Sequence, residues 1–400
     1  MPDFSAVDLR PKQRRFLSRL RAALDAELPG DLQETDFVLS EEPPDSRAMA
    51  VLARHGWIMP RWARSAGGAG LDQIEAKLLE LELERRHATV PGHYRLAPGP
   101  VTRHGSEELK AEVLPRVAQG KAMVCLGYTE PDSGSDAAAA KTRAEQRGAT
   151  WVINGQKIFT TGAHFADYCW LLTRTDQVSP KHRGLTMFLM PMTLPGIEVR
   201  PLPALGRGRS NVLYLTDVEV PDRYRCGPVN GGWAVAGTSL DEGHGVSPED
   251  DAHLGKINGL GWVATRALER ALAATMEWAR SPTSADGRCP IDDPDIRRRL
   301  ARVELDIEVN WNTPAEMGRV VAAETLVRDL SDLVAIVGPA AILTAGVEGS
   351  VGGGDLEVAI RFAQASLTFG GTVEVFRNNI AQRRLGLPRP APPAPGKAAS

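Results

Sequence analysis

The sequence lacks the features that would indicate a membrane protein, a metal centre or a nucleic-acid binder. It has no run of about 18 apolar residues, so we expect no membrane-spanning segment. Its eight histidines show no H-E-x-x-H or similar ligand spacing, so we predict no metal site. A net charge of −3 over 400 residues argues against the basic field that non-specific nucleic-acid binding requires.

Cysteine is also scarce, and its placement argues against a disulfide framework. The four cysteines form no C-x-x-C pair and are widely spaced in the sequence. The first residues, Met1-Pro2-Asp3-Phe4, do not show the basic region and apolar core of a signal peptide. We therefore expect a cytoplasmic protein with reduced, partly buried thiols. The cysteines are Cys125, Cys169, Cys226 and Cys289.

The chain does have enough apolar residues for a large core. With 400 residues, 42% of them hydrophobic, it can form two or three structural units. Residues 1–120 show a helical period, in which Phe16, Leu20 and Leu24 recur every four positions. We therefore predict an N-terminal helical domain over residues 1–120.

The pattern changes to short apolar runs between residues 121 and 229. Short strands at close spacing without helices between them favour an antiparallel barrel or sandwich. The dipeptide Asn154-Gly155 predicts a turn that joins two of these strands. The strand candidates are residues 151–154, 168–173, 185–190, 197–200, 212–215 and 218–220.

The helical period returns over residues 230–388. Asp292 or Asp293 is expected to cap one of these helices, with Pro294 in its first turn. Residues 389–400 are rich in Pro and Ala and are predicted to be a disordered tail. Periodicity alone thus indicates an α+β protein with helices at both ends.

Two motifs in the central region carry more specific information. The first runs from Thr129-Glu130-Pro131 to Gly134-Ser135-Asp136, and the second is Asn154-Gly155-Gln156-Lys157 followed by Phe159-Thr160-Thr161. The first motif taken alone is compatible with an ordinary surface turn. The pair of motifs resembles those of the acyl-CoA dehydrogenases.

This resemblance extends over nearly the whole chain. Residues 56–71 are similar to the family's N-terminal segment, residues 230–233 to the start of its C-terminal domain, and residues 369–388 to its end. The ending and the turn at residues 181–184 are most similar to the actinobacterial branch that acts on steroid-derived CoA thioesters. The resemblance implies an N-terminal helical domain, a central antiparallel β-barrel domain and a C-terminal four-helix bundle.

Membership of this family would imply FAD and an acyl-CoA thioester as ligands. In the family, a carboxylate takes the α-proton and the flavin accepts a hydride from the β-carbon. By resemblance, Thr129 and Thr161 would offer hydroxyls to the flavin, and Arg280 would reach the flavin of a neighbouring subunit. The residues expected to bind the cofactor are Leu126, Tyr128, Thr129, Ser135, Phe159, Thr160, Thr161, Arg280 and Thr372. Those expected to bind the substrate are Ser135, Asp241, His244 and Gly371.

The family's catalytic glutamate is missing from both of its usual positions. These positions hold Gly370, within Phe369-Gly370-Gly371-Thr372, and Gly243, within Leu240-Asp241-Glu242-Gly243-His244. Glu242 is the remaining candidate base, but a shift of one residue turns a side chain by about 100° around a helix. The segment that cradles a neighbour's flavin is altered too, with Asp286, Pro294 and residues 335–339 departing from the family pattern.

Three interpretations follow from these observations. The chain could be a non-catalytic or half-site subunit that pairs with a homologous chain carrying the glutamate. It could instead be an active homo-oligomer that uses Glu242. The third possibility is a flavin-free acyl-CoA-binding or scaffold protein, or an enzyme with other flavin chemistry, because a fold does not determine a function.

Overall fold

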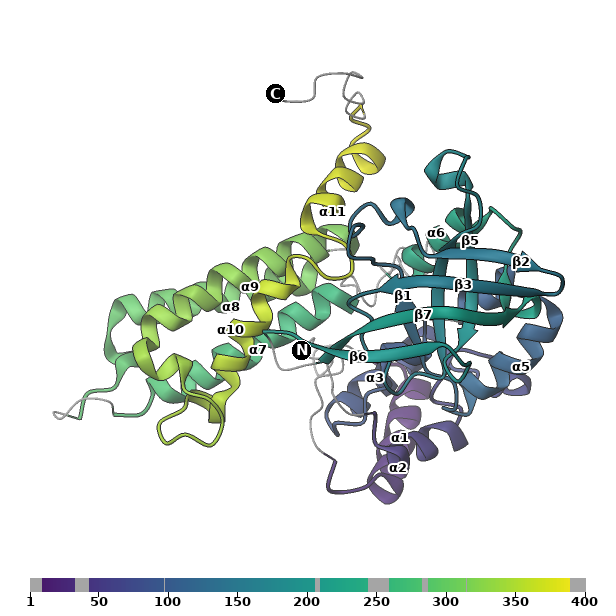
Figure 1. Cartoon of the computed structure of the whole chain (residues 1–400). Helices are drawn as coiled ribbons and strands as arrows, with labels where there is room; N and C mark the ends of the chain where they lie inside the picture. The colour runs from purple at the N-terminus through teal and green to yellow at the C-terminus, as the bar shows by residue number, and fades with distance from the viewer. Residues whose placement is uncertain are drawn as a thin grey trace, which may run out of the picture. The chain divides into compact units, whose positions relative to one another are not determined.

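The computed structural model describes residues 9–32, 43–96, 98–205, 209–243, 259–282, 287–313 and 315–388. The chain divides into two compact units, Met1–Leu254 and Gly255–Ser400. The first unit contains the N-terminal helices, a β-sheet and one further helix, and the second contains a helical bundle (Figure 1). The predicted tail at residues 389–400 lies outside the described residues.

Five α-helices precede the sheet in the described part of the chain, in keeping with the helical period. Leu20 and Leu24, two residues of the predicted apolar stripe, are buried in a cluster formed by the first three helices and the segments beside them. Side-chain caps define several helix starts: Asp45 and Ser106 accept backbone N–H groups, and Asp72 forms a capping box with Glu75. The helices are α1 (Pro11–Glu27), α2 (Ser46–Arg54), α3 (Gln73–Glu84), α4 (Pro98–His104) and α5 (Glu107–Ala118).

The central region forms an eight-stranded sheet in the order β6-β7-β3-β2-β4-β5-β8, with β1 paired to β4. Most neighbours are antiparallel, as expected, but β1 and β2 run parallel to β4, so the sheet is mixed. A parallel pair needs a long crossover connection, and residues 128–167, which include the β2–β3 hairpin, connect β1 to β4. The strands are β1 (Val124–Gly127), β2 (Arg143–Arg147), β3 (Thr150–Lys157), β4 (Tyr168–Arg174), β5 (Leu185–Pro191), β6 (Ile197–Pro203), β7 (Arg209–Pro221) and β8 (Arg225–Cys226).

The predicted turn at Asn154-Gly155 is also wrong, because β3 runs straight through these residues. The register of β3 against β7 shifts between Ile153 and Gly155, which makes the site a bulge. Asn154 fixes the bulge: its Nδ2 donates to Asp217 Oδ1 at 3.0 Å and its Oδ1 accepts from Asp217 N at 2.9 Å. The hairpin turn lies instead between Arg147 and Thr150.

The core of the first unit lies around β4 and β5, in which nearly every residue is buried. Helix α6 (Gly232–Gly243) contacts β5 and α4, so it belongs to this unit. Three of the four cysteines are buried and all four are free thiols. Cys125 and Cys169 are direct neighbours on β1 and β4, although they are far apart in the sequence.

The second unit is built from four long helices that pack on one another. They are α7 (Gly259–Ala279), α8 (Pro294–Asn312), α9 (Ala315–Val337) and α10 (Asp355–Ser366). Asp293 caps α8 by accepting from Asp295 N, and Pro294 is its first residue, which confirms one of the two predicted caps. Helix α11 (Val373–Asn379) and a turn of π-helix at Ile380–Arg384 follow the Phe369–Thr372 loop.

None of the described helices is both long and apolar enough to span a bilayer. Among the same residues, no group of His, Cys, Asp and Glu side chains is arranged to hold a metal ion.

Candidate functional site

A buried ion pair joins the two sequence motifs into one structure. Glu130, in the loop after β1, is 5% exposed, and Lys157, the last residue of β3, is fully buried. Lys157 Nζ donates to Glu130 Oε1 at 2.8 Å and to the carbonyl of Tyr128 at 3.3 Å. Glu130 also accepts the backbone N–H groups of Lys141 and Thr142, at 2.6 and 2.9 Å. Both motifs are therefore required to hold the loop in place.

The carboxylate of this pair is stabilised in its charged form. Burial alone would raise the pKa of Glu130, but the attraction of Lys157 and the hydrogen bonds that Glu130 accepts hold the pKa of this carboxyl below its usual range. Burial lowers the pKa of Lys157, an effect that Glu130 opposes. Because a buried charge is costly without a partner, each member of the pair depends on the other.

The turn at residues 159–161 follows Lys157 directly and lies beside the same loop. Ile158 N donates to the carbonyl of Thr129 at 2.9 Å. Phe159 has φ +56°, a left-handed conformation that is uncommon for a residue other than glycine, and its side chain is 62% exposed. An exposed aromatic residue in a strained conformation indicates a site where a ligand or partner packs.

Two buried hydroxyls beside the loop have no hydrogen-bond partner within the described residues. They are Thr160 Oγ1, on a fully buried residue, and Ser133 Oγ. Buried polar atoms are usually satisfied, so these unpaired hydroxyls fit a site that is completed by a polar ligand. The exposed ring of Phe159 and these hydroxyls together suit the flat, hydrogen-bonding ring of a flavin.

The structure places most of the predicted flavin-binding residues around this loop and turn. Leu126 lies at the end of β1, and Tyr128, Thr129 and Thr161 are half-buried. Ser135 is exposed at the far end of the loop, in keeping with a role toward a substrate rather than a buried ring.

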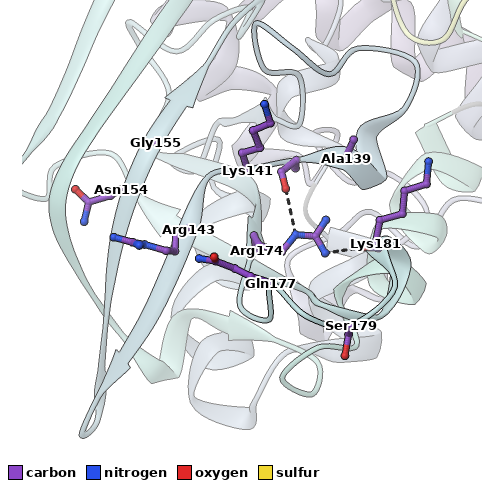
Figure 2. Close-up of a pocket in the computed structure, with 10 residues that line it drawn as sticks. Ala139, Lys141, Arg143, Asn154, Gly155, Arg174, Gln177, Ser179 and Lys181 are labelled. Atoms are coloured by element: carbon purple, nitrogen blue, oxygen red, sulfur yellow. Dashed lines mark hydrogen bonds between the residues drawn. The ribbon is translucent and has the colours of Figure 1, made fainter. Parts of the chain in front are cut away.

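A basic pocket of about 660 Å³ lies beside the base of the β2–β3 hairpin (Figure 2). Four cationic side chains line it: Lys141, Arg143, Arg174 and Lys181. Arg174 is mostly buried and donates to the carbonyls of Ala138, Ala140 and Lys181 at 2.6, 3.2 and 2.8 Å, so it organises the pocket wall. None of the lining residues is acidic, so the pocket is suited to an anionic group.

The two lysines of the pocket also form ion pairs with the loop after β1, which carries the first motif. Lys141 pairs with Asp132 at 2.9 Å and Lys181 with Asp136 at 2.5 Å. These ion pairs are half or more exposed, so each contributes at most about 1 kcal/mol. They connect the pocket to the loop without fixing it rigidly.

The Phe369–Thr372 loop in the second unit has a different structure. Gly370 and Gly371 have φ +65° and +97°, so both take left-handed conformations that favour glycine. Thr372 caps α11 by accepting from Val375 N at 3.3 Å, which gives its hydroxyl a structural role in addition to the predicted ligand role. Gly370, which the sequence analysis expects at the family's base position, therefore belongs to a turn that a glutamate could adopt only with strain.

Sequence reasoning missed Arg319, which holds this loop. Arg319 is 1% exposed on α9 and donates to the carbonyls of Ser366, Phe369 and Gly371, at 2.6, 3.0 and 3.4 Å. It makes no ion pair with the described residues, and burial lowers its pKa to about 10. The available signal was an arginine inside the apolar stretch 317–323, but nothing in the sequence identifies its carbonyl partners.

The remaining predicted residues lie elsewhere. Arg280 is exposed just after the last turn of α7. Asp241, Glu242 and Gly243 form the end of α6, which is helical to Gly243, and their side chains are not among those described. His244 lies outside the described residues, as does Asp286. The predictions for these positions stay predictions.

Comparison with known proteins agrees with this architecture. Residues 10–121 match the N-terminal domain of acyl-CoA dehydrogenases and residues 125–218 match the middle domain. The acyl-CoA dehydrogenase FadE29 of Mycobacterium tuberculosis is 30% identical over 96% of this chain and 99% of its own length. FadE26 of the same organism is also 30% identical, over 85% of this chain and 87% of its own length.

Solved structures give the same result. The Tcur3481-Tcur3483 steroid ACAD superposes with a TM-score of 0.79 at 27% identity, covering 96% of this chain and 99% of that one. The ChsE4-ChsE5 complex of Mycobacterium tuberculosis superposes with a TM-score of 0.77 at 26% identity, covering 96% and 100%. Both similar structures are complexes of two different chains by name.

Helices, a central sheet carrying the paired motifs and a closing helical bundle together define the acyl-CoA-oxidising class of flavoproteins. The chain belongs to the acyl-CoA dehydrogenase family. The predicted α+β architecture and the resemblance to the steroid-catabolic branch are confirmed by these relatives. Members of this family are FAD flavoproteins.

Proposed function

We propose that this chain is a non-catalytic or half-site subunit of an FAD-linked acyl-CoA dehydrogenase. It would work in a mixed assembly with a homologous subunit that supplies the catalytic glutamate. The observation that carries the proposal is the contrast between an intact flavin-facing loop and turn and a glycine at each family base position, Gly243 and Gly370.

FAD is the cofactor that the described residues fit. Bound FAD would supply the hydride acceptor of an α,β-desaturation. Thr129 and Thr161 would donate or accept hydrogen bonds at the ring, and Phe159 would pack beside it. The unpartnered hydroxyls of Thr160 and Ser133 support this assignment. Arg280 would extend toward the flavin of a neighbouring subunit.

The proposed substrate is an acyl-CoA thioester with a steroid-derived acyl group. The basic pocket beside the motif loop offers charge for the phosphates of CoA, since lysine and arginine are the usual partners of phosphate oxygens. Ser135 would lie near the pantetheine, and Asp241, His244 and Gly371 would complete the substrate site. The steroid assignment rests on the names of the similar proteins.

The proposed partner is a homologous acyl-CoA dehydrogenase chain. Two similar solved structures are complexes of two such chains. Helix α8 exposes Leu305 and Val309, one turn apart on the same face, at 62% and 45%. Such neighbouring apolar side chains are suited to burial against another subunit.

The test is expression of this chain alone and together with candidate homologous chains. FAD per chain is counted by absorbance after denaturation, and exchange of the α-proton of a bound acyl-CoA is followed by deuterium incorporation. We expect little FAD and no exchange for the chain alone, and both in a mixed assembly. One tightly bound FAD per chain in a pure homo-oligomer would contradict the proposal.

Two variants then identify the source of the base. Glu242→Gln is expected to change exchange by the mixed assembly less than tenfold, whereas loss of a general base costs about 10²–10⁴-fold. Glu219→Gln, on an exposed position of β7, is the matched control for removing one carboxylate. If Glu242→Gln abolishes exchange and the control variant does not, Glu242 is the base. The reason for a second subunit is then removed.

A further inference from the structure

The flavin-facing turn at residues 159–161 depends on one side chain that the sequence motifs do not include. Asn211 lies on β7 and is fully buried. The ladder between β3 and β7 ends with Lys157 opposite Leu213. Beyond that point, Thr160 N donates to the carbonyl of Asn211 at 3.0 Å. Asn211 is therefore the residue of β7 that hydrogen-bonds the turn beyond the last regular pair of β3 and β7.

The side chain of Asn211 makes a second connection to the same turn. Its Nδ2 donates to the carbonyl of Thr160 at 3.0 Å and lies 3.2 Å from His164 Nδ1. Its Oδ1 accepts from Arg209 Nε at 3.0 Å. Every hydrogen-bonding atom of the amide is thus used, and the acceptor at Thr160 together with the donor at Arg209 fixes which way the amide points.

We infer that Asn211 is the positioning residue of the flavin-facing turn. Its backbone carbonyl accepts the N–H of Thr160 and its side chain donates to the carbonyl of Thr160, so Asn211 fixes the peptide groups on either side of this residue. The same two bonds hold the neighbouring Phe159 in its left-handed conformation with its ring exposed. Without the hydrogen bonds from Asn211 to Thr160, Phe159 is expected to relax to an ordinary backbone conformation, because a left-handed backbone is unfavourable for a residue with a Cβ atom.

The histidine on the other side of Asn211 belongs to the same arrangement. Because Nδ2 of Asn211 donates, Nδ1 of His164 must accept, which places the imidazole proton of the neutral ring on Nε2. His164 packs edge-on against Phe165 at 4.6 Å between ring centroids, and His93 packs against the same ring at 5.7 Å. His93 also hydrogen-bonds the Thr161 backbone. The side-chain amide of Asn211 thus links the turn to the rings of His164 and Phe165.

The inference rests on the proposed function only in naming the turn as flavin-facing. Its first test needs no flavin. Hydrogen exchange of the peptide covering residues 158–166 is measured by mass spectrometry on the purified full chain, for wild type and Asn211→Asp. This variant keeps the shape of the side chain but removes both donors. We expect at least tenfold faster exchange in this peptide, with the protection of β4 and β5 unchanged.

A matched control uses another asparagine of the same sheet. Asn154→Ala removes the amide that fixes the β3 bulge through Asp217, away from the turn, and it should leave exchange in residues 158–166 unchanged. Arg209→Met removes only the group that holds Asn211 Oδ1, and it should accelerate exchange in the same peptide by a smaller factor. Arg209→Met therefore still tests the inference if Asn211→Asp fails to fold.

A spectroscopic measurement separates positioning from general stability. ¹⁵N-imidazole NMR should assign His164 in the wild type to the form with the proton on Nε2, and Asn211→Ala should alter that signal while the folded content stays constant. Unchanged exchange in residues 158–166 together with an unchanged His164 signal would overturn the inference.

Flavin binding forms the last arm of the test. Absorbance titration with FAD, in the assembly that binds it, should show at least tenfold weaker binding for both Asn211→Asp and Thr161→Val. If Thr161→Val weakens binding and Asn211→Asp does not, the positioning role is wrong. If Asn211→Asp opens the turn and neither variant changes flavin binding, the positioning role stands and the proposed flavin site is wrong.

Discussion

Two loops of this protein are each held by a buried cation, and the two cations differ in what surrounds them. Lys157 has the carboxylate of Glu130 at 2.8 Å, and that carboxylate also accepts two backbone N–H groups. Arg319 has only carbonyl oxygens of the Ser366–Gly371 segment, and its Nε is buried without a partner in the described chain. The first loop keeps the family's motif, whereas the second has glycine where the family has its base.

Under the proposed function, the Phe369–Thr372 loop keeps an ordered local framework although Gly370 stands at the expected base position. A carboxylate beside a buried cation compensates the charge, whereas carbonyl dipoles compensate it only in part. Burial lowers the pKa of both cations, and Glu130 opposes this effect for Lys157, while burial alone lowers the pKa of Arg319 to about 10. The Phe369–Thr372 loop is nevertheless ordered by three hydrogen bonds and by the rings of Phe369 and Phe376 beside the guanidinium.

The largest effect on stability is expected from breaking the buried ion pair of Glu130 and Lys157. Glu130→Ala leaves Lys157 buried without a counter-ion, and removing one partner of a buried ion pair costs about 3–5 kcal/mol. The measurement is the free energy of unfolding in urea. Lys141→Met, which removes the lysine of the exposed Asp132 pair, is the control and should stay within about 0.5 kcal/mol of wild type.

A second substitution sharpens this result. Combining Glu130→Ala with Lys157→Met removes both charges and should recover part of the loss, because a buried pair can often be replaced by apolar groups at little cost. A double variant no more stable than Glu130→Ala alone would mean that the Tyr128, Lys141 and Thr142 backbone groups, not the charge of Lys157, dominate the loss.

Removing the side chain of Arg319 should destabilise the protein less than removing the carboxylate of Glu130. Arg319→Met removes a buried charge that has no carboxylate partner among the described residues, but it leaves the carbonyls of Ser366, Phe369 and Gly371 without this donor. We expect a loss of about 1–3 kcal/mol, the usual cost of buried unsatisfied polar groups. If Arg319→Met destabilises the chain more than Glu130→Ala does under the same conditions, the contrast between the two sites is wrong.

The sequence analysis singled out the two motifs that contain Glu130 and Lys157, although not their ion pair, and missed Arg319, for a physical reason. The residues of the Glu130–Lys157 site lie in two short motifs that can be read directly from the chain. The contacts of Arg319 are to backbone carbonyls 47 to 52 residues away, which leave no side-chain signal. The prediction of a turn at Asn154-Gly155 failed similarly, because this dipeptide pairs with a bulge of β7 that contains Asp217, 63 residues away from Asn154.

Helix positions were predicted more reliably than strand pairing. The cap at Asp293 and the buried stripe of α1 depend on residues close in sequence. The parallel neighbours β1 and β4 depend on a hairpin between them, and Asn211 acts from a strand about 50 residues after the turn that it holds. Non-local contacts of this kind are not encoded in a local pattern.

Glycine substitutions compare the two loops at the level of the backbone. Gly370 has φ +65°, so Gly370→Ala should cost about 1–2 kcal/mol. Gly134, in the first loop, has no positive φ and nothing within 4 Å of an added Cβ, so Gly134→Ala should be nearly neutral. Thermal unfolding of both variants is the measurement. Equal losses at the two positions would remove the proposed reason for glycine at the base position.

The smallest expected effect is on the dependence of stability on pH. Because the pKa of Glu130 is lower in the folded chain than its ordinary value of 4.5, its contribution is fully present above that value. The contribution is lost as the pH falls through the folded pKa, because the folded protein must then bind a proton that the unfolded chain already holds. Glu130→Gln should therefore lose less stability than wild type on acidification below pH 4.5. Urea unfolding at a series of pH values tests this, with Glu304→Gln as the exposed control, and parallel curves for wild type and Glu130→Gln would show that Lys157 does not lower the pKa of Glu130.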